Sequence, residues 1–297
     1  MRVFVAGATG AIGRPLLPRL VAAGHEVTGM TRSEERAAGV REAGAQAVVC
    51  DVFDQQALGT AMAEAAPEVV VHQLTALPER FDFRDDDLYT ATNRLRGEGT
   101  RILLGAAAAV GARRMVAQSI SFVSERPGPG KYGEAMATVL DMERAVTGSS
   151  ELEGLVLRYG FFYGPGTAYG EQGSSTADVR KRRFPVIGRG EGVFSFIHVD
   201  DAADATVAAV ERGAPGVYDV VDDDPASMRD WLPAFAAAIG AKKPLRVPAW
   251  LAGLVAGREA VGFATRMQGA SNARARVELG WAPHWPSWRQ GFRDAPR

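Results

Sequence analysis

The sequence predicts a doubly wound α/β fold, in which helices cover both faces of a parallel sheet. Two observations predict it. Short β-type runs alternate with helical stretches through the first half of the chain. Several runs are continuously apolar, as at residues 3–6 and 69–71, which is typical of strands buried on both faces. Helical connections on the order of ten residues imply right-handed crossovers between parallel strands.

The expected strands follow in chain order. They lie at residues 3–6, 26–30, 47–50, 69–71, 115–117, 155–157 and 216–221. Helices are expected between and after them, at residues 13–23, 33–43, 55–65, 88–110, 138–146, 200–211 and 227–239. Gly24 and Gly111 end two of these helices, and Ser33 caps another. Asp200 or Asp201 is the expected cap of the helix that runs to Glu211.

The second half of the chain has a different pattern. Residues 159–199 are rich in Gly, Pro and aromatic residues, with little periodicity. We therefore predict a dinucleotide-binding domain at 1–160, with 190–222 contributing late sheet and helix elements. Residues 161–190 and 223–297 then form a smaller substrate-binding domain. A chain of 297 residues is long enough for this arrangement.

Composition narrows the class of protein. Lys and Arg number 34 against 35 for Asp and Glu, so no basic surplus favours nucleic acid as a partner. Cys50 is the only cysteine, which favours a reducing, cytoplasmic setting. The apolar run near the N-terminus is too short for a signal peptide or a membrane span. The four histidines are scattered without metal-ligand spacing, so no metal site is expected.

A glycine-rich turn follows the first predicted strand. It reads Gly7-Ala8-Thr9-Gly10-Ala11-Ile12-Gly13 and leads into a predicted helix. In such turns the first glycine permits the tight turn, the second admits the pyrophosphate, and the third lets helix and strand pack closely. The helix N-terminus then offers unpaired N–H groups to the phosphates. The turn predicts a dinucleotide cofactor, bound by Gly7, Thr9, Gly10, Ala11, Ile12 and Gly13.

The residues after the second strand indicate which dinucleotide is bound. An NAD site usually places a carboxylate there, to bind the ribose hydroxyls. This chain has Met30-Thr31-Arg32-Ser33 instead. Arg32 can bind a 2′-phosphate bidentately, and Arg14 can assist it. We therefore predict NADP in preference to NAD, although Arg32 is alternatively a solvated residue at the entry of a helix.

Further motifs extend the pattern along the chain. Asp51-Val52 follows the third strand, and Leu74-Thr75-Ala76 follows the fourth. Asn93 precedes Gly99-Thr100 on a predicted helix. Residues 158–166 read Arg-Tyr-Gly-Phe-Phe-Tyr-Gly-Pro-Gly. With the glycine turn, this ordered set resembles the extended or atypical short-chain dehydrogenases/reductases, which include NAD(P)-dependent epimerases and dehydratases and have a Rossmann-type fold.

The resemblance implies roles for these residues. Asp51 and Val52 would contact adenine, and Leu74, Thr75 and Ala76 would pass beside the cofactor ribose. Asn93 and Ser119 would lie against the cofactor as well. The stretch Tyr159, Gly160, Phe161 and Phe162 would touch the nicotinamide. All these side chains are therefore predicted cofactor-binding residues.

The proton-transfer pair of this family is missing. The family uses Tyr-x-x-x-Lys, in which lysine lowers the pKa of a phenol that is otherwise near 10. Counting back from Glu143, which resembles the family's helix glutamate, the two places fall at Ala135 and Val139. Tyr132 is followed four residues later by Met136, so it does not restore the pattern. Neither alanine nor valine can transfer a proton.

Three side chains are candidate substitutes. Ser119 and Ser121 lie on one face at the end of the fifth strand by period two. Tyr132 is the only tyrosine between the fifth and sixth strands. Each has a plainer interpretation: Tyr132 is equally well a surface-loop tyrosine, and the serines can satisfy backbone groups at a strand end.

The sequence thus predicts an NADP(H)-dependent oxidoreductase or epimerase acting on a small carbonyl or alcohol substrate, with a non-standard catalytic site. Two alternatives remain open. One is a non-catalytic NADP(H)-binding regulator, and the other is a redox-neutral isomerase or lyase on the same scaffold. A monomer and a homodimer are both compatible with the Ala-rich faces of the helices near 88–110 and 134–147.

Overall fold

The computed structural model, which describes residues 1–78 and 80–294, is built on a seven-stranded sheet. All its neighbouring strands are parallel, in the order β11-β6-β5-β4-β1-β2-β3. The strands are β1 (Arg2–Ala6), β2 (Glu26–Thr31), β3 (Gln46–Val49), β4 (Val69–His72), β5 (Arg114–Ile120), β6 (Glu153–Tyr159) and β11 (Gly216–Val220). The doubly wound α/β prediction is therefore confirmed.

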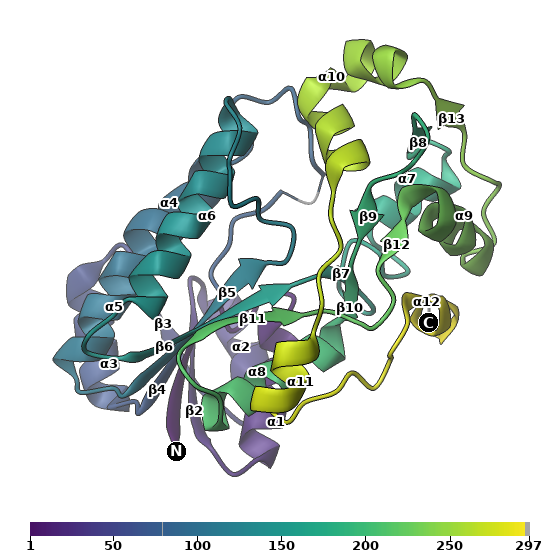
Figure 1. Ribbon diagram of the computed structural model, residues 1–297. Coiled ribbons are helices and arrows are strands. Elements are labelled where there is room, and N and C mark those ends of the chain that lie inside the picture. The colour runs from purple at the N-terminus through teal and green to yellow at the C-terminus, as the bar shows by residue number, and fades with distance from the viewer. Residues whose placement is uncertain (79, 295–297) are drawn as a thin grey trace.

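Helices cover both faces of this sheet (Figure 1). One face packs against α1 (Gly13–Ala22), α2 (Glu34–Glu42), α8 (Val199–Glu211) and α11 (Ala273–Glu278). The other packs against α3 (Gln55–Ala65), α5 (Thr100–Ala109) and α6 (Lys131–Thr147). Side chains alternate along β1: Val3 and Val5 enter the first core, whereas Phe4 enters the second. The apolar run at the start of the chain therefore serves two cores at once.

The strand order changes direction between β1 and β4. The chain proceeds from β1 through β2 to β3 on one side, then returns to β4 and continues through β5 and β6 on the other. In open parallel sheets, ligands bind outside the carboxyl ends of the strands at such a switch point. The glycine turn directly follows β1 and therefore lies at this place.

A smaller aromatic-rich region lies beyond the carboxyl edge of the sheet (Figure 1). Its strands are β7 (Phe161–Tyr163), β8 (Val186–Ile187), β9 (Val193–Phe194), β10 (Phe196–His198), β12 (Ala226–Ser227) and β13 (Arg246–Val247). Its helices are α7 (Ser174–Arg180), α9 (Met228–Ala238), α10 (Ala249–Arg266) and α12 (Trp288–Asp294). The core of this region is built around Phe194, Phe196, Trp231 and Trp288, all buried. This small core lies on the side of the switch point, beyond the carboxyl ends of the strands.

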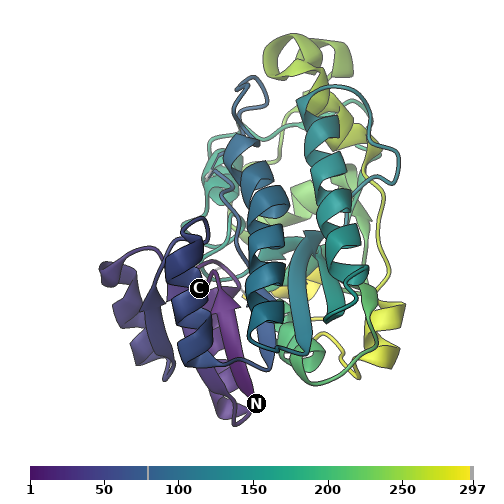
Figure 2. The ribbon, with the colours of Figure 1, turned by 90° about the vertical axis from the view of Figure 1, so that its left-hand side faces the viewer.

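Two predicted helices differ in the structure. The stretch expected at 88–110 is divided into α4 (Thr90–Arg94), a π-helical turn η1 (Leu95–Gly99) and α5. The helix expected at 138–146 begins at Lys131 instead, so Tyr132 is helical and not in a loop. Periodicity missed this start because Gly133 stands in the first turn, where any Cβ would collide with the Gly128 carbonyl. Figure 2 shows the α4–α5 stretch and α6 side by side.

The predicted cap of α8 is also wrong. His198, and not Asp200 or Asp201, is the capping residue, and its Nδ1 accepts a hydrogen bond from the Asp200 amide at 3.2 Å. Asp201 is buried and accepts from the backbone amides of His284 and Trp285 at 2.8 and 3.0 Å. Its carboxylate is therefore used to hold the C-terminal segment, a long-range role that local sequence does not reveal.

Arg114 ties the sheet to the end of α8. Its guanidinium is buried, pairs with Glu153 at 2.7 Å, and donates to the carbonyls of Ala209, Arg212 and Gly213. These carbonyls lie at and beyond the last turn of α8, where intrahelical donors are lacking. One side chain thus satisfies three acceptors and fixes α8 against β5.

Replacing Arg114 with methionine should lower the free energy of unfolding by about 3 kcal/mol, because three carbonyls and a carboxylate lose their donor. Urea denaturation measures this change. Arg113→Met is the matched control, since the Arg113 side chain is 46% exposed, and its effect should stay within about 0.5 kcal/mol. Equal losses in the two variants would contradict the anchoring role.

Candidate cofactor and active site

The glycine turn is a tight backbone arrangement that other residues cannot adopt. Gly7 has a φ of +95°, and a Cβ there would lie 2.7 Å from the Gln73 carbonyl oxygen. At Gly13, a Cβ would overlap the Gly7 carbonyl and the backbone of Ala8. Both glycines therefore permit close approach of α1 to β1 and β4, as the sequence predicted for their backbone role.

The space beside Gly10 is open. Its amide donates to the Gly7 carbonyl at 3.1 Å, and a Cβ at Gly10 would meet only that carbonyl oxygen, at 3.4 Å. Thr9 and Ala11 flank it at the surface, and Ile12 is buried beneath. At the start of α1 the Arg14 amide donates to the Gly10 carbonyl at 3.1 Å and Pro15 has no N–H, and no acidic side chain lies in the first turn of the helix. A pyrophosphate group fits this cradle.

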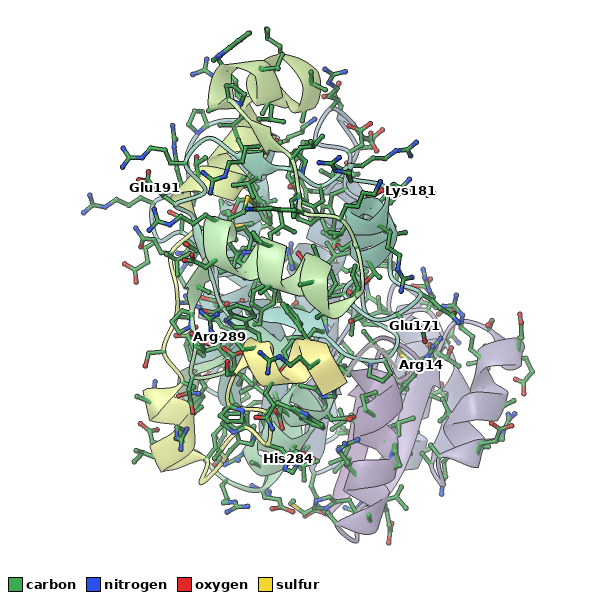
Figure 3. All side chains as sticks on the ribbon, turned by 90° about the vertical axis from the view of Figure 1, so that its right-hand side faces the viewer. Arg14, Glu171, Lys181, Glu191, His284 and Arg289 are labelled. Carbon is green, nitrogen blue, oxygen red and sulfur yellow. The ribbon has the colours of Figure 1, made fainter. Side chains whose placement is uncertain are left out.

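Two arginines border the turn. Arg32, which directly follows β2, is exposed and forms no hydrogen bond or ion pair with any residue that the structure describes. Arg14 is also exposed, and its Nε donates to the Thr9 carbonyl at 3.2 Å; it stands beside the start of α1 in Figure 3. Neither guanidinium forms an ion pair with a carboxylate in the described chain, so both are available to an anionic group at this edge.

The residues predicted to contact adenine and the cofactor ribose lie at the ends of β3 and β4. Asp51 is exposed and its Oδ1 accepts the Phe53 amide at 2.9 Å, which shapes the turn, while Val52 is buried below it. The segment Leu74-Thr75-Ala76 leaves β4 half-buried. Its last amide, that of Ala76, donates to Thr92 Oγ1 at 3.3 Å.

His72 positions this segment from below. Its Nδ1 accepts the Leu74 amide at 3.2 Å, so the proton lies on Nε2, which donates to Thr100 Oγ1 at 2.9 Å. Burial and, to a lesser extent, the nearby Arg96 charge lower the pKa of His72 to about 4. The imidazole is neutral at physiological pH, and both its nitrogens are occupied. It therefore serves as a structural link between β4 and α5.

Asn93 lies on α4 at the same edge. Its Oδ1 is buried and has no hydrogen-bond partner among the residues that the structure describes. An unpaired buried carbonyl costs free energy unless a ligand supplies the missing donor. Asn93 therefore fits the predicted role of contacting a bound cofactor.

The predicted serines differ in their surroundings. Ser119 lies in β5, is 1% exposed, and donates to Glu143 Oε1 at 2.5 Å. Glu143 is also bound by Arg158 through two hydrogen bonds, at 2.8 and 2.6 Å. Ser121 lies just past the strand, half-buried, and its amide donates to the Tyr159 carbonyl. Only Ser121 keeps a hydroxyl without a protein partner among the described residues.

Tyr132 is half-buried in the first turn of α6. Its ring meets Tyr89 edge-on with centroids 6.3 Å apart. Its amide donates to Glu259 Oε1 on α10 at 3.4 Å, while the other oxygen of Glu259 is buried without a partner in the described chain. Burial raises the pKa of Tyr132, and the Glu259 charge raises it further. At neutral pH the phenol can therefore donate a proton but cannot act as a base.

Ala135 and Val139, at the places of the absent tyrosine and lysine, are both completely buried. They pack on the inner face of α6 with Met136 and Met142. No ionisable group replaces them on this helix face until Glu143, whose oxygens are already engaged. The inner face of α6 at these two positions is therefore apolar and carries no group that can transfer a proton.

The nicotinamide-side stretch continues into an aromatic wall. Tyr159 is buried, with its hydroxyl 2.6 Å from Thr206 Oγ1. Gly160 packs against the Ser195 carbonyl, where a Cβ would lie at 2.7 Å. Phe162 packs beside Tyr159, with centroids 5.4 Å apart. Phe161 packs on the opposite side, against the core of the smaller region. It is the first member of an aromatic cluster that we call the aromatic wall.

That wall is formed by phenylalanines from distant parts of the chain. Phe161 stacks on Phe122 with centroids 4.7 Å apart and an interplanar angle of 5°. Phe263 on α10 meets both rings edge-on, and Phe83 packs on Phe263. Phe83, Phe122, Phe161 and Phe263 are all partly exposed. Sequence patterns missed this cluster because its members come from four separate segments.

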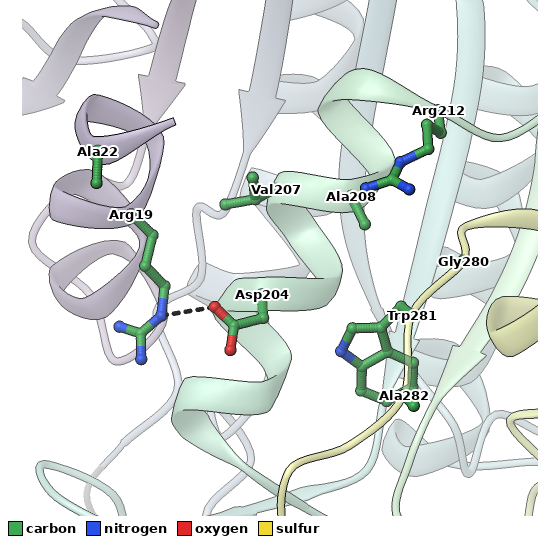
Figure 4. A pocket seen from close by; sticks show the side chains of 9 residues that line it. All are labelled: Arg19, Ala22, Asp204, Val207, Ala208, Arg212, Gly280, Trp281 and Ala282. Carbon is green, nitrogen blue, oxygen red and sulfur yellow. Dashed lines mark hydrogen bonds and ion pairs between the residues drawn. The ribbon is translucent and has the colours of Figure 1, made fainter. Parts of the chain in front are cut away.

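A separate hollow lies between α1, α8 and residues 280–282 (Figure 4). It is a pocket of about 400 Å³, lined in part by Val207, Ala208 and Trp281. Its charges are satisfied internally, since Arg19 pairs with Asp204 at 2.8 Å and with Asp200 at 2.9 Å. It lies at the far end of α1 from the glycine turn and lacks groups of catalytic chemistry.

Two further findings concern residues 1–78 and 80–294. No group of three or more potential metal ligands is assembled among them. Among the helices in this part of the chain, none combines the length and the apolar character that a membrane crossing requires.

Comparisons with known proteins agree with this geometry. Residues 3–220 match the model of the NAD dependent epimerase/dehydratase family. A curated Streptomyces relative, "3-diazoavenalumate denitrifying reductase", is 46% identical over 98% of this chain and 99% of its own. The Thermus thermophilus UDP-glucose 4-epimerase in complex with NAD is 25% identical, with a TM-score of 0.75, and covers 99% and 97% of the two chains. A human epimerase family protein with NADPH is 20% identical, with a TM-score of 0.74, and covers 100% and 99%.

Gly10→Ala should leave the fold intact and weaken NADPH binding at least about tenfold. The added methyl group meets only the Gly7 carbonyl at an ordinary contact distance, yet it fills space that the pyrophosphate needs. NADPH fluorescence titration and thermal unfolding measure the two effects. Gly39→Ala, on the exposed side of α2 with nothing near its Cβ, is the control. Unchanged NADPH binding in Gly10→Ala would show that the glycine turn does not bind the pyrophosphate.

His72→Gln should make the free energy of unfolding depend less on pH between pH 7 and pH 5. Because the folded pKa is lowered from 6.5 to about 4, the unfolded chain binds a proton first as the pH falls through 6.5. Wild-type protein then loses stability progressively towards pH 4, by about 2 kcal/mol between pH 7 and pH 5 from this residue. Urea unfolding at both pH values measures the difference. His284→Gln, at an exposed position, should keep the wild-type slope; equal slopes for all three proteins would contradict the assignment.

Proposed function

The chain belongs to the NAD dependent epimerase/dehydratase family, and we propose that within it the protein is an NADP(H)-dependent reductase that removes nitrogen from an aromatic diazo compound. The family membership confirms the resemblance predicted from the sequence. It also confirms an NAD(P)-dependent oxidoreductase or epimerase as the class of enzyme. The substrate and the preference for NADP are the parts that we propose.

The observation that supports the proposal is the pair of buried apolar residues, Ala135 and Val139, at the proton-transfer positions. Reduction of a carbonyl places negative charge on oxygen, which a nearby acid must neutralise. Interconversion of alcohol epimers needs a base for the hydroxyl proton in the same place. An alanine and a valine remove this function, so a reaction without an oxyanion suits the site better.

Reduction of a diazonium group is such a reaction. When bound, the reduced nicotinamide supplies a hydride. In the substrate, the hydride electron pair forms a new C–H bond, and the C–N bond breaks with its pair leaving on dinitrogen. Charge and atoms balance without a proton from the protein. The name of the Streptomyces relative, with a diazo substrate, a reductase activity and removal of nitrogen, supports this choice.

The aromatic wall supports a flat aromatic substrate. Phe122 and Phe161 present stacked rings beside the nicotinamide-side stretch, and Phe263 closes the wall from α10. Phenylalanines offer apolar stacking area and exclude water, which would otherwise attack a reactive diazonium group. The wall therefore binds the ring, orients it and protects it.

NADP is favoured by two guanidinium groups at the adenine edge that no carboxylate of the described chain neutralises. Arg32 and Arg14 are exposed and have no carboxylate partner in the described chain. A 2′-phosphate would supply the missing anion, with the bidentate geometry that arginine favours. Solved relatives with either NAD or NADPH are known, so the preference rests on these side chains.

Carbonyl reduction is the second candidate, because Tyr132 offers a half-buried phenol at the start of α6. A proton donated from Tyr132, or from Ser121 with Ser119 behind it, would neutralise the oxyanion. Tyr132→Phe combined with Ser121→Ala separates the two reactions: the double variant should leave diazo reduction intact and abolish carbonyl reduction.

The test of the proposal is product analysis with an aryl diazonium carboxylate and 4-deuterated NADPH. We expect loss of dinitrogen, one equivalent of NADPH oxidised, and deuterium on the ring carbon that held nitrogen. The Gly10→Ala variant controls for uncatalysed decomposition. Nitrogen loss without NADPH oxidation, or no turnover of diazo compounds beside rapid carbonyl reduction, would refute the diazo assignment.

Arg32→Ala should weaken NADPH binding about tenfold and leave NADH binding within about twofold, because one charge-assisted contact to the 2′-phosphate is lost. Fluorescence titration with both cofactors measures the ratio. Arg36→Ala, at an exposed position on the next helix, is the control. A parallel loss for both cofactors would show that Arg32 does not select the phosphate.

A further inference from the structure

Arg96 is a charged side chain that the site described above does not use. It lies in the π-helical turn η1 and is only 4% exposed. Its guanidinium makes no hydrogen bond and no ion pair with any residue in 1–78 or 80–294. Burying a guanidinium without partners costs several kcal/mol. Such a cost points to a ligand that supplies the missing acceptors.

The neighbouring groups are already engaged. Glu143 lies close enough to act on Arg96, but its oxygens accept from Arg158 and Ser119. His72 uses both ring nitrogens on Leu74 and Thr100. Burial lowers the pKa of Arg96 to about 10, against the opposing effects of Glu143 and Tyr89, so the guanidinium stays charged at neutral pH. The protein therefore attracts this charge through Glu143 without giving the guanidinium a hydrogen bond in the described chain.

Two observations indicate which ligand group it faces. Arg96 follows Asn93 by three residues on one helix face, and Asn93 Oδ1 is also buried without a partner among the described residues. The turn η1 packs against α6, and a Cβ at Gly97 in η1 would lie 3.9 Å from Thr138, the residue before Val139. A donor group and a buried acceptor without protein partners thus come from the same helical stretch, which packs on the helix that carries the place of the absent lysine.

We propose that Arg96 donates hydrogen bonds to the ribose on the nicotinamide side of the bound dinucleotide, and so supplies from η1 the positive charge that Val139 does not supply from α6. A ribose offers two hydroxyl oxygens, which match the parallel donors of a guanidinium. Asn93 completes the pair as acceptor. This inference rests on the proposed function, since it requires a dinucleotide at the site.

The local helix geometry fits this role. A π-turn inserts extra backbone into a helix and redirects its side chains, and such turns are common at functional sites. Gly97 and Gly99 stand in the same turn, and a Cβ at Gly97 would lie 3.9 Å from Thr138 on α6. The two helices can therefore approach closely beside Arg96. Arg96 is a positioning residue for the cofactor and not a proton donor.

Binding of two ligands to three variants tests the proposal. NADPH contains the nicotinamide ribose, whereas 2′,5′-ADP contains only the adenine half. Arg96→Met should weaken NADPH binding about tenfold and leave 2′,5′-ADP binding unchanged, because only the former loses its contacts. Arg96→Lys keeps the charge and should stay within about threefold of wild type. Arg101→Met, at an exposed position one turn further along, should bind both ligands normally.

Thermal unfolding of the ligand-free proteins supplies an independent readout. Removing a buried charge without a hydrogen-bonded partner should leave the unfolding temperature of Arg96→Met equal to or above that of wild type, while the stabilisation by added NADPH shrinks. A lower unfolding temperature together with equal losses for both ligands would make Arg96 structural and overturn the proposal. Unchanged NADPH affinity in Arg96→Met would also overturn it. Failure of wild type to bind either ligand would instead refute the proposed function.

Discussion

The close approach of α1 to the first strand is the constraint on which the rest of the structure depends. Gly13 lies against the Gly7 carbonyl and the Ala8 backbone so tightly that no side chain fits between them. Gly7 in turn lies against Gln73 at the end of β4. These contacts place the N-terminus of α1 at the switch point, where the sheet reverses its order. The cradle, the His72 link and the loop after β4 are all arranged around it.

A second constraint acts on the other side of the switch point. Glu143 is saturated by Ser119 and Arg158, so the buried ion pair joins α6 to β5 and β6. A carboxylate so engaged does not take part in proton transfer and forms no ion pair with Arg96 in the described chain, although its charge favours the charged form of Arg96. The same bonds that hold α6 in place therefore leave one buried guanidinium without a hydrogen-bonded partner. Glu143 therefore has a structural role, because each acceptor can serve only a limited number of donors.

The aromatic wall and the inner face of α6 bear on the reaction that we propose. Ala135 and Val139 make the inner face of α6 apolar. Phenylalanines from the loop after β5, from β7 and from α10 complete an environment without a base. An apolar site of this kind suits transfer of hydride to an electrophile that releases a neutral gas, since no charge needs to be stabilised on oxygen.

The sequence by itself determined the fold class, the glycine turn and the loss of the Tyr-Lys pair. Each depends on local features: continuous apolar runs, glycines at fixed spacing, and residue identity at counted positions. It placed the helix cap at Ser33 correctly and the cap at Asp200 or Asp201 wrongly, since the ring nitrogen of His198 accepts the Asp200 amide at the start of α8. It assigned Asn93 to the cofactor but passed over Arg96 three residues later.

Only the tertiary structure decided which polar side chains are satisfied. Ser119 and Arg158 meet Glu143 across 24 and 15 residues of chain, and Tyr132 meets Glu259 across 127. The aromatic wall likewise joins segments without any shared period. Local pattern cannot reveal such pairings, because burial and hydrogen-bond partners are set by the packing of distant elements. The lack of a hydrogen-bonded partner at Arg96 likewise follows only from the tertiary structure, because it depends on which donors the neighbouring acceptors bind.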